Sequence, residues 1–144
     1  MARSTLTAQL PYRTETVWAV VTDLEDTVWR SDLHRVEVPS PTAFIEYDNQ
    51  GHATHFTVTD SQPPYRWTFT MEGGAFVGQW TGEFQPVAAG VRLTFTEEIS
   101  PKRWWMALFL PVYLRRQQRR YLADLRRALA HRAGGSLDNG FPAR

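Results

Sequence analysis

Residues 101–133 read PKRWWMALFLPVYLRRQQRRYLADLRRALAHRA, and this stretch decides which fold the chain can adopt. A helix of that length spans roughly 45 Å, which is enough to cover a whole sheet. Its first third is almost entirely apolar, and its second part carries arginine at 115, 116, 119, 120, 126 and 127. The preceding chain reads mostly as short strands, whose apolar face needs a cover. We therefore predict a sheet packed against one long C-terminal helix.

Composition favours a single globular domain. The chain has 144 residues, of which 42% are hydrophobic and 13% aromatic, and it contains six tryptophans but no cysteine. We expect one domain over residues 1–133 and a disordered, glycine-containing tail over 134–144. Without cysteine there is no disulfide, thiolate nucleophile or cysteine-bound metal, which favours a reducing cytoplasm. No apolar run has the length of a signal peptide or a membrane span.

The small net charge of +1 hides an asymmetry along the chain. Residues 1–100 contain six arginines against thirteen acidic residues, near −7, whereas residues 101–144 contain ten basic residues against two, near +8. A basic helix can bind nucleic acid or an anionic membrane. We favour the simpler interpretation, a basic helix lying on an acidic sheet domain, and expect no nucleic-acid partner.

Periodicity in residues 1–100 predicts one helix and several strands. Residues 4–10 alternate as a half-buried strand, and Thr14 can begin a helix with apolar positions at Val17, Trp18 and Val21. A second short helical or turn segment is expected near residues 24–29. Turn-forming residues then separate five apolar runs, which we predict to form an antiparallel meander of strands at 36–47, 52–60, 65–72, 76–85 and 91–99.

Several strand positions point toward a pocket rather than a solid core. Large residues share the inner faces, with Gly78 and Gly82 interleaved among Phe76, Trp80 and Phe84. A glycine on an apolar face gives either a bend or an empty volume. Glu97 shares its face with Leu93 and Phe95, where an unpaired carboxylate is costly. We expect Glu97 at the rim of a pocket or beside a partner in a polar-lined cavity.

Four segments resemble the START-like or SRPBCC superfamily, and in particular its bacterial polyketide cyclase/dehydrase-like family, which is related in fold to the birch pollen allergen. They are LPYRTETVWAVVTDLEDTVWRSDLHRVEV at 10–38, SQPPYRWTFTMEGG at 61–74, GQWTGEFQPVAAGVRLTFTEE at 78–98, and the pattern Leu122, Asp124, Leu125 and Leu129. The Gly-Thr usual before the family's last strand is Gly90-Val91 here. The resemblance covers about residues 4–133, and its motifs are structural rather than catalytic.

This resemblance implies an α+β helix-grip fold. In it a curved antiparallel sheet wraps around the C-terminal helix, and two short helices follow the first strand. Members of the family bind lipids, sterols, polyketides or hormones in a cavity between sheet and helix, and some catalyse cyclisation or dehydration. Fold alone does not decide between these functions.

Sequence motifs give little support to other chemistry. His52 and His55 are three apart, so on a strand they point to opposite faces and cannot easily share a metal ion. No nucleophile elbow, phosphate loop or dinucleotide fingerprint occurs. We expect no metal and no cofactor. Glu46 and Asp48 share a face, which we interpret as the solvated side of an outer strand.

Helical spacing places Gln118 in the middle of an inward-facing stripe. The stripe contains Leu129, Leu125, Leu122, Gln118, Leu114, Pro111, Ala107 and Trp104. Gln118 could bind a ligand, pair with Glu97 or pack at a kink. Pro111 should break or bend the helix. Trp105, Met106, Phe109 and Tyr113 lie off the stripe, which indicates a lid over the pocket mouth, a homodimer contact or a membrane contact.

We therefore expect binding of a small hydrophobic or amphipathic ligand, with Leu108 and Leu122 among the contacts. Two alternatives remain open. One is a cyclase- or dehydratase-like enzyme with Glu97 as general acid or base, and the other is a membrane or partner module formed by residues 102–114. The predicted ligand-binding residues are Trp67, Phe69, Met71, Trp80, Phe95, Glu97, Leu108, Gln118 and Leu122.

Overall fold

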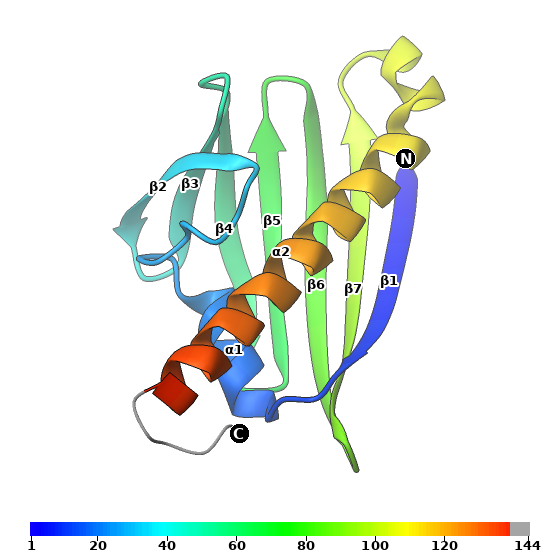
Figure 1. Ribbon diagram of the computed structural model, residues 1–144. Helices are drawn as coiled ribbons and strands as arrows, with labels where there is room; N and C mark the ends of the chain where they lie inside the picture. The colour runs from blue at the N-terminus through cyan, green and yellow to red at the C-terminus, as the bar shows by residue number, and fades with distance from the viewer. Residues whose placement is uncertain (139–144) are drawn as a thin grey trace.

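The computed structural model describes residues 1–138, which form a seven-stranded antiparallel sheet with one long helix lying diagonally across it (Figure 1). The strand order is β1-β7-β6-β5-β4-β3-β2, so consecutive strands pair except where β7 returns beside β1. The strands are β1 (Ala2–Leu10), β2 (Leu33–Ser40), β3 (Ala43–Asp48), β4 (Ala53–Gln62), β5 (Arg66–Gly73), β6 (Phe76–Val87) and β7 (Gly90–Pro101). The predicted α+β architecture and the meander are confirmed.

The predicted strand at 36–47 is in fact a hairpin. A turn at 41–42 separates β2 from β3, and the two strands pair with irregular register. Pro41 lacks a backbone N–H and cannot continue the ladder, so the chain turns there. This extra hairpin forms the end of the sheet opposite β1.

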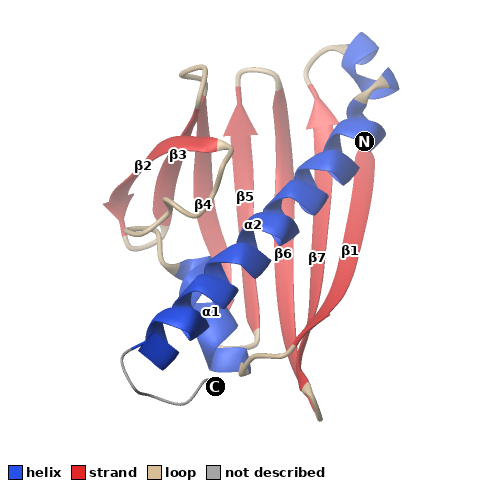
Figure 2. Cartoon of the chain, viewed as in Figure 1, coloured by secondary structure: helices blue, strands red, loops and turns tan. Residues whose placement is uncertain are grey.

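One helix, α1 (Thr14–Thr22), follows β1, and the second short helix does not form. The Asp23 carboxylate accepts the backbone N–H groups of Glu25 and Asp26, at 3.0 and 3.3 Å. These local bonds hold a turn, which competes with helix formation. Residues 23–32 therefore run as a loop from α1 to the edge hairpin (Figure 2).

The long helix begins later and ends later than predicted. β7 continues to Pro101, a 3-10 helix, η1, covers Trp104–Leu108, and α2 spans Leu110–Asp138. Pro111 lies in the first turn of α2, where a missing N–H costs nothing, so it marks a start rather than a kink. The helix passes the expected boundary at Ala133, and residues 139–144 of the predicted tail lie outside the described residues.

Two buried polar contacts fasten α2 to the rest of the domain. Gln118 accepts a hydrogen bond from the Ser4 hydroxyl at 2.7 Å and donates to the Ser4 carbonyl at 2.9 Å. Asp124, which is 3% exposed, accepts bonds from the backbone N–H and hydroxyl of Ser31, both at 2.8 Å. These contacts tie α2 to β1 and to the loop after α1, so the helix stands at a fixed position over the sheet.

The solid core occupies only part of the space beneath α2. Around α1, the fully buried side chains belong to β1, β6, β7, α1 and the second half of α2, and they are Leu10, Val17, Val20, Phe84, Val91, Leu93, Leu125 and Leu129. Toward the other end of the sheet the residues are mostly aromatic. The glycines of β6 leave no empty volume, because neighbouring side chains occupy the space beside them. The Trp80 ring lies over Gly82, and the Ile99 side chain lies over Gly78.

Candidate ligand-binding site

A cavity of about 1190 Å³ lies between α2 and the inner face of the sheet. Residues of η1 and α2 line it on one side, and residues of the strands from β3 to β7 on the other. The connections β3–β4 and β5–β6, together with Pro101 at the end of β7, contribute lining residues at one end of the sheet, which we call the mouth. Its volume lies somewhat above the roughly 300–1,000 Å³ that is usual for small-molecule sites.

The sheet wall of the cavity is a continuous aromatic surface. The rings of Phe69 and Trp80 stack with centroids 4.9 Å apart, and Trp80 lies 5.0 Å from Phe95. Trp67 meets Phe69 edge-on at 5.2 Å. Each ring is held by its neighbours, so this wall offers a large apolar contact area at low cost in side-chain entropy.

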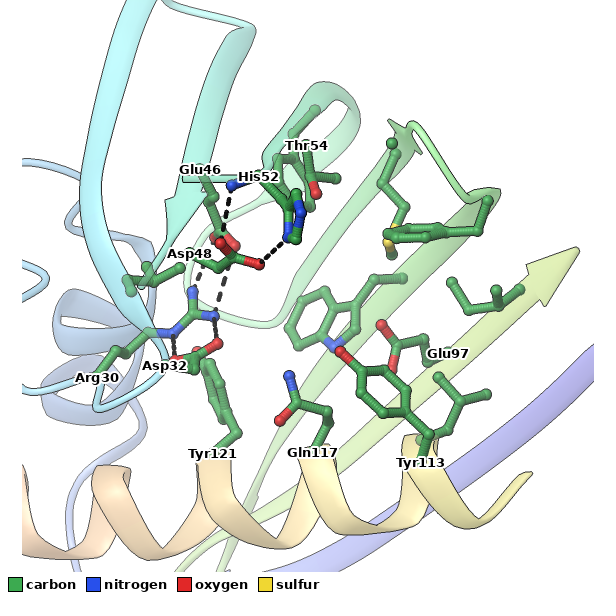
Figure 3. Close-up of a pocket in the computed structure, with 18 of the residues that line it drawn as sticks. Arg30, Asp32, Glu46, Asp48, His52, Thr54, Glu97, Tyr113, Gln117 and Tyr121 are labelled. Atoms are coloured by element: carbon green, nitrogen blue, oxygen red, sulfur yellow. Dashed lines mark hydrogen bonds and ion pairs between the residues drawn. The ribbon is translucent and has the colours of Figure 1, made fainter. Parts of the chain in front are cut away.

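A charged network closes the other side of the cavity (Figure 3). Arg30 donates to the Glu46 carboxylate at 2.8 Å and forms two bonds to Asp32, at 2.8 and 3.2 Å. Its guanidinium also lies over the Tyr121 ring, 5.1 Å from the centroid. Although burial disfavours the charged form, the carboxylates of Glu46 and Asp32 raise the pKa of Arg30 above its ordinary value. The network is therefore a fixed, ionised wall.

Asp48 and His52 extend this wall toward the mouth. The Asp48 carboxylate lies 3.2 Å from the His52 ring and accepts the backbone N–H of His52 at 2.8 Å. Burial works against ionisation, but these hydrogen bonds hold the pKa of Asp48 below its usual value. Asp48 is therefore charged at neutral pH.

Glu97 points into the cavity from β7 and is different from the other carboxylates (Figure 3). Within the described part of the chain no hydrogen bond or ion pair reaches it. Burial, followed by the negative charge of Glu46, raises the pKa of Glu97 to about 7, while Arg30 acts in the opposite direction. Tyr113 of α2 also faces this space, and burial together with the charge of Glu97 raises its pKa. A carboxyl group with a pKa near neutral thus stands without a partner in the cavity.

The cavity brings together most of the residues expected from the sequence. Seven of the nine predicted ligand-binding residues line it: Trp67, Phe69, Met71, Trp80, Phe95, Glu97 and Gln118. The amide of Gln118, however, is taken up by Ser4 and by the Phe95 carbonyl at 3.4 Å, and it does not pair with Glu97. Its contacts give it a structural role.

Leu108 and Leu122 do not line the cavity, contrary to prediction. Leu108 belongs to η1 rather than to α2 and is 72% exposed. Leu122 packs against the core instead. Because α2 begins at Leu110, its cavity face carries Tyr113, Gln117 and Tyr121.

The interpretation of Glu46 as part of the solvated side of an outer strand is wrong, and for Asp48, whose side chain is 43% exposed, it holds only in part. Both line the cavity, and the Glu46 side chain is only 14% exposed. The two-residue alternation of β3 could have predicted this inner position, because the buried Phe44 lies on the same face of the strand as Glu46 and Asp48. Arg30 and Asp32 were not predicted, since they lie in a loop without periodicity.

His52 and His55 are separated as expected: His52 lines the cavity, whereas His55 is exposed and absent from its lining. Among the described residues, no group of three histidine or acidic side chains could hold a metal ion.

An apolar lip borders the mouth, formed by residues 104–113 of η1 and the start of α2. Trp105, Met106, Phe109 and Tyr113 line the cavity. Trp104, Leu108 and Val112 are 82%, 72% and 65% exposed, so they face away from the protein. None of the helices in residues 1–138 is long and apolar enough to cross a membrane.

Comparison with known proteins identifies a family that shares this architecture. The family model described as polyketide cyclase/dehydrase and lipid transport matches residues 1–130. No functionally curated protein matches the sequence.

Solved structures share the fold at low sequence identity. A START superfamily protein from Mycobacterium smegmatis has 12% identity and a TM-score of 0.79, covering 86% of this chain and 94% of its own. A conserved protein from Geobacillus kaustophilus has 16% identity and a TM-score of 0.75, covering 90% and 96%. A protein from the dynemicin biosynthetic locus has 17% identity and a TM-score of 0.69, covering 99% of this chain and 49% of its own. The helix-grip, START-like fold is confirmed.

Proposed function

Because the chain belongs to the polyketide cyclase/dehydrase and lipid transport family, we propose that it binds a small hydrophobic or amphipathic molecule in the cavity between the sheet and α2. Lipids, polyketides and aromatic compounds are the classes of ligand that we propose. The observation that carries this proposal is the cavity itself, about 1190 Å³, with an aromatic wall facing a charged one. Apolar surface supplies affinity in such sites, and a few polar groups supply orientation.

Each wall has a defined part in binding. Trp67, Phe69 and Trp80 form the aromatic surface that a ring system or acyl chain would contact. Glu97 and the Arg30 network would fix the polar end of the ligand. Gln118 is left out of this assignment, because its amide is already bonded to Ser4.

Native mass spectrometry of the purified protein tests this proposal. We expect a bound small molecule that is lost on denaturation, or uptake of an added hydrophobic compound by protein stripped with solvent. Trp80→Ala removes part of the aromatic wall and should weaken uptake, whereas Trp18→Ala is a matched control, because Trp18 packs on Phe84 outside the cavity lining. Protein that neither carries nor takes up any compound would refute the proposal.

The apolar lip supports a membrane as the source of the ligand. Trp104, Leu108 and Val112 point outward at the mouth, and exposed Arg103 and Arg116 flank them in the sequence. Apolar side chains beside basic ones are suited to the surface of an anionic bilayer. A transient contact through the lip, including Trp105, Phe109 and Tyr113, would place the mouth against the lipid.

Flotation with phosphatidylserine-containing vesicles tests the membrane contact. Trp104→Ser combined with Leu108→Ser should reduce binding several-fold. Val28→Ser is the control, because Val28 is 93% exposed but lies in the loop after α1. Binding that both variants retain would contradict the membrane contact, and a concentration-dependent mass change in sizing experiments would indicate a homodimer through the lip instead.

A cyclase- or dehydratase-like enzyme is the second candidate function. The specific observation is Glu97, unpaired in the cavity with a pKa of about 7, with the Tyr113 hydroxyl group on the facing helix. Such a carboxyl can serve as general acid or base at neutral pH. If a turned-over compound is found, Glu97→Gln should lower kcat by at least about a hundredfold. Unchanged turnover in that variant would remove Glu97 from any mechanism.

A further inference from the structure

The charged groups that line the cavity are predominantly negative. Two guanidinium groups, Arg30 and Arg120, face five carboxylates: Asp23, Asp32, Glu46, Asp48 and Glu97. The lining also contains one histidine, His52, which lies beside Asp48. The cavity therefore has an excess of negative charge, although the protein as a whole has a net charge of +1.

Arg30 offers no free site for an anionic ligand, and Arg120 is partly occupied by the loop. Arg30 is bonded to both Asp32 and Glu46, so its charge is more than compensated within the wall. Arg120 donates to the hydroxyl and the carbonyl of Ser31, each at 2.8 Å, and fixes the loop to α2. A carboxylate or phosphate near Arg30 would have to break its ion pairs with Asp32 and Glu46, and elsewhere in the cavity it would meet the excess of negative charge.

Glu97 is the acceptor that the protein leaves unsatisfied. It is half-buried, faces the cavity and has no hydrogen bond or ion pair among the described residues (Figure 3). The groups that face its space are Glu46, Asp48 and His52 from the edge of the sheet, Arg30 and Asp32 from the loop, and Tyr113, Gln117, Arg120 and Tyr121 from α2. A buried carboxylate without a partner is unfavourable unless a ligand supplies one.

Resting on the proposed function, we propose that the ligand is amphipathic with a cationic or hydrogen-bond-donating head, such as an ammonium group, which binds Glu97, and that anionic heads are rejected. The aromatic wall holds the body of such a ligand. Trp80 and Tyr113 line the same space as Glu97. The head of the bound ligand would supply the partner that Glu97 lacks within the protein.

Calorimetric titration with three compounds that share one apolar body tests the head-group preference. The probes are naphthylmethylamine, naphthalenemethanol and naphthoate, added to solvent-stripped protein. At pH 8 we expect the amine to bind at least about tenfold more tightly than the carboxylate, with the alcohol between them. At pH 6 the preference should narrow, because Glu97, whose pKa is raised to about 7, takes up a proton and the cavity becomes less negative.

Glu97→Gln should reduce the difference between amine and carboxylate to about twofold, because it removes the charge and keeps the shape. Glu98→Gln is the matched control: its side chain points to the other face of β7, outside the cavity lining, and the preference should persist. Equal binding of all three probes, or tighter binding of naphthoate, would overturn this inference and leave the binding function standing. Failure of every probe to bind would instead count against the proposed function.

Discussion

Gln117 and Gln118 are adjacent on α2 but have different environments. Gln118 is 5% exposed, and its amide bonds the hydroxyl and carbonyl of Ser4. Gln118→Ala leaves these buried groups unpaired, and we expect it to lower the free energy of unfolding by about 1–3 kcal/mol in urea denaturation. Gln117→Ala is the control and should stay within about 0.5 kcal/mol, because Gln117 is partly exposed on the cavity side. Equal losses in both variants would contradict a structural role for Gln118.

Glu97 makes stability depend on pH in an unusual direction for a carboxyl group. Its pKa rises from 4.5 to about 7, so the folded state holds a proton that the unfolded state releases. Stability is therefore greatest below pH 4.5 as far as this group is concerned, and it is lost as pH rises toward 7. Glu97→Gln removes this loss. As pH rises from 5 to 8, the free energy of unfolding of the variant should therefore increase relative to that of the wild type by on the order of 2 kcal/mol. A difference between the two proteins that stays constant with pH would show that Glu97 is not buried as described.

At the scale of elements, β6 depends on a glycine at its contact with β7. A Cβ atom on Gly78 would lie 2.4 Å from the Glu98 carbonyl oxygen, which is backbone and cannot move aside without separating the strands. We expect Gly78→Ala to destabilise the protein by about 1–3 kcal/mol in thermal or urea unfolding. Gly74→Ala, with no atom within 4 Å of the added Cβ, should be nearly neutral. A neutral Gly78→Ala would mean that the two strands are less tightly paired there.

The elements differ in how far periodicity could predict them. Alternation placed Trp67, Phe69 and Met71 on the inner face of β5, because a half-buried strand repeats every two residues. Helical spacing failed for Leu108, since the residues before Leu110 are not part of α2. Whether Pro111 kinks a helix or begins one depends on where β7 ends. That end is set by the pairing of β7 with β6, which a local pattern does not show.

At the scale of the whole molecule, the fold was predictable and the polar half of the site was not. The order of strands and the final helix follow from local patterns and from the family resemblance. The network of Arg30, Asp32 and Glu46 joins a loop to a strand, and no local pattern records such a contact. The free carboxylate of Glu97 was visible in the sequence as a polar residue on an apolar face, whereas its surroundings required the structure.

The tryptophan indole N–H signals in a proton–nitrogen NMR spectrum test the central claim, a ligand-binding cavity on the aromatic wall, most directly. Trp67 and Trp80 line the cavity, whereas Trp18 and Trp104 do not. When a naphthalene-based probe is added to solvent-stripped protein, we expect the signals of Trp67 and Trp80 to shift and saturate, while those of Trp18 and Trp104 change little. Single Trp→Phe variants assign the signals. Unchanged Trp67 and Trp80 signals at saturating probe, or shifts confined to Trp104, would contradict binding in the cavity.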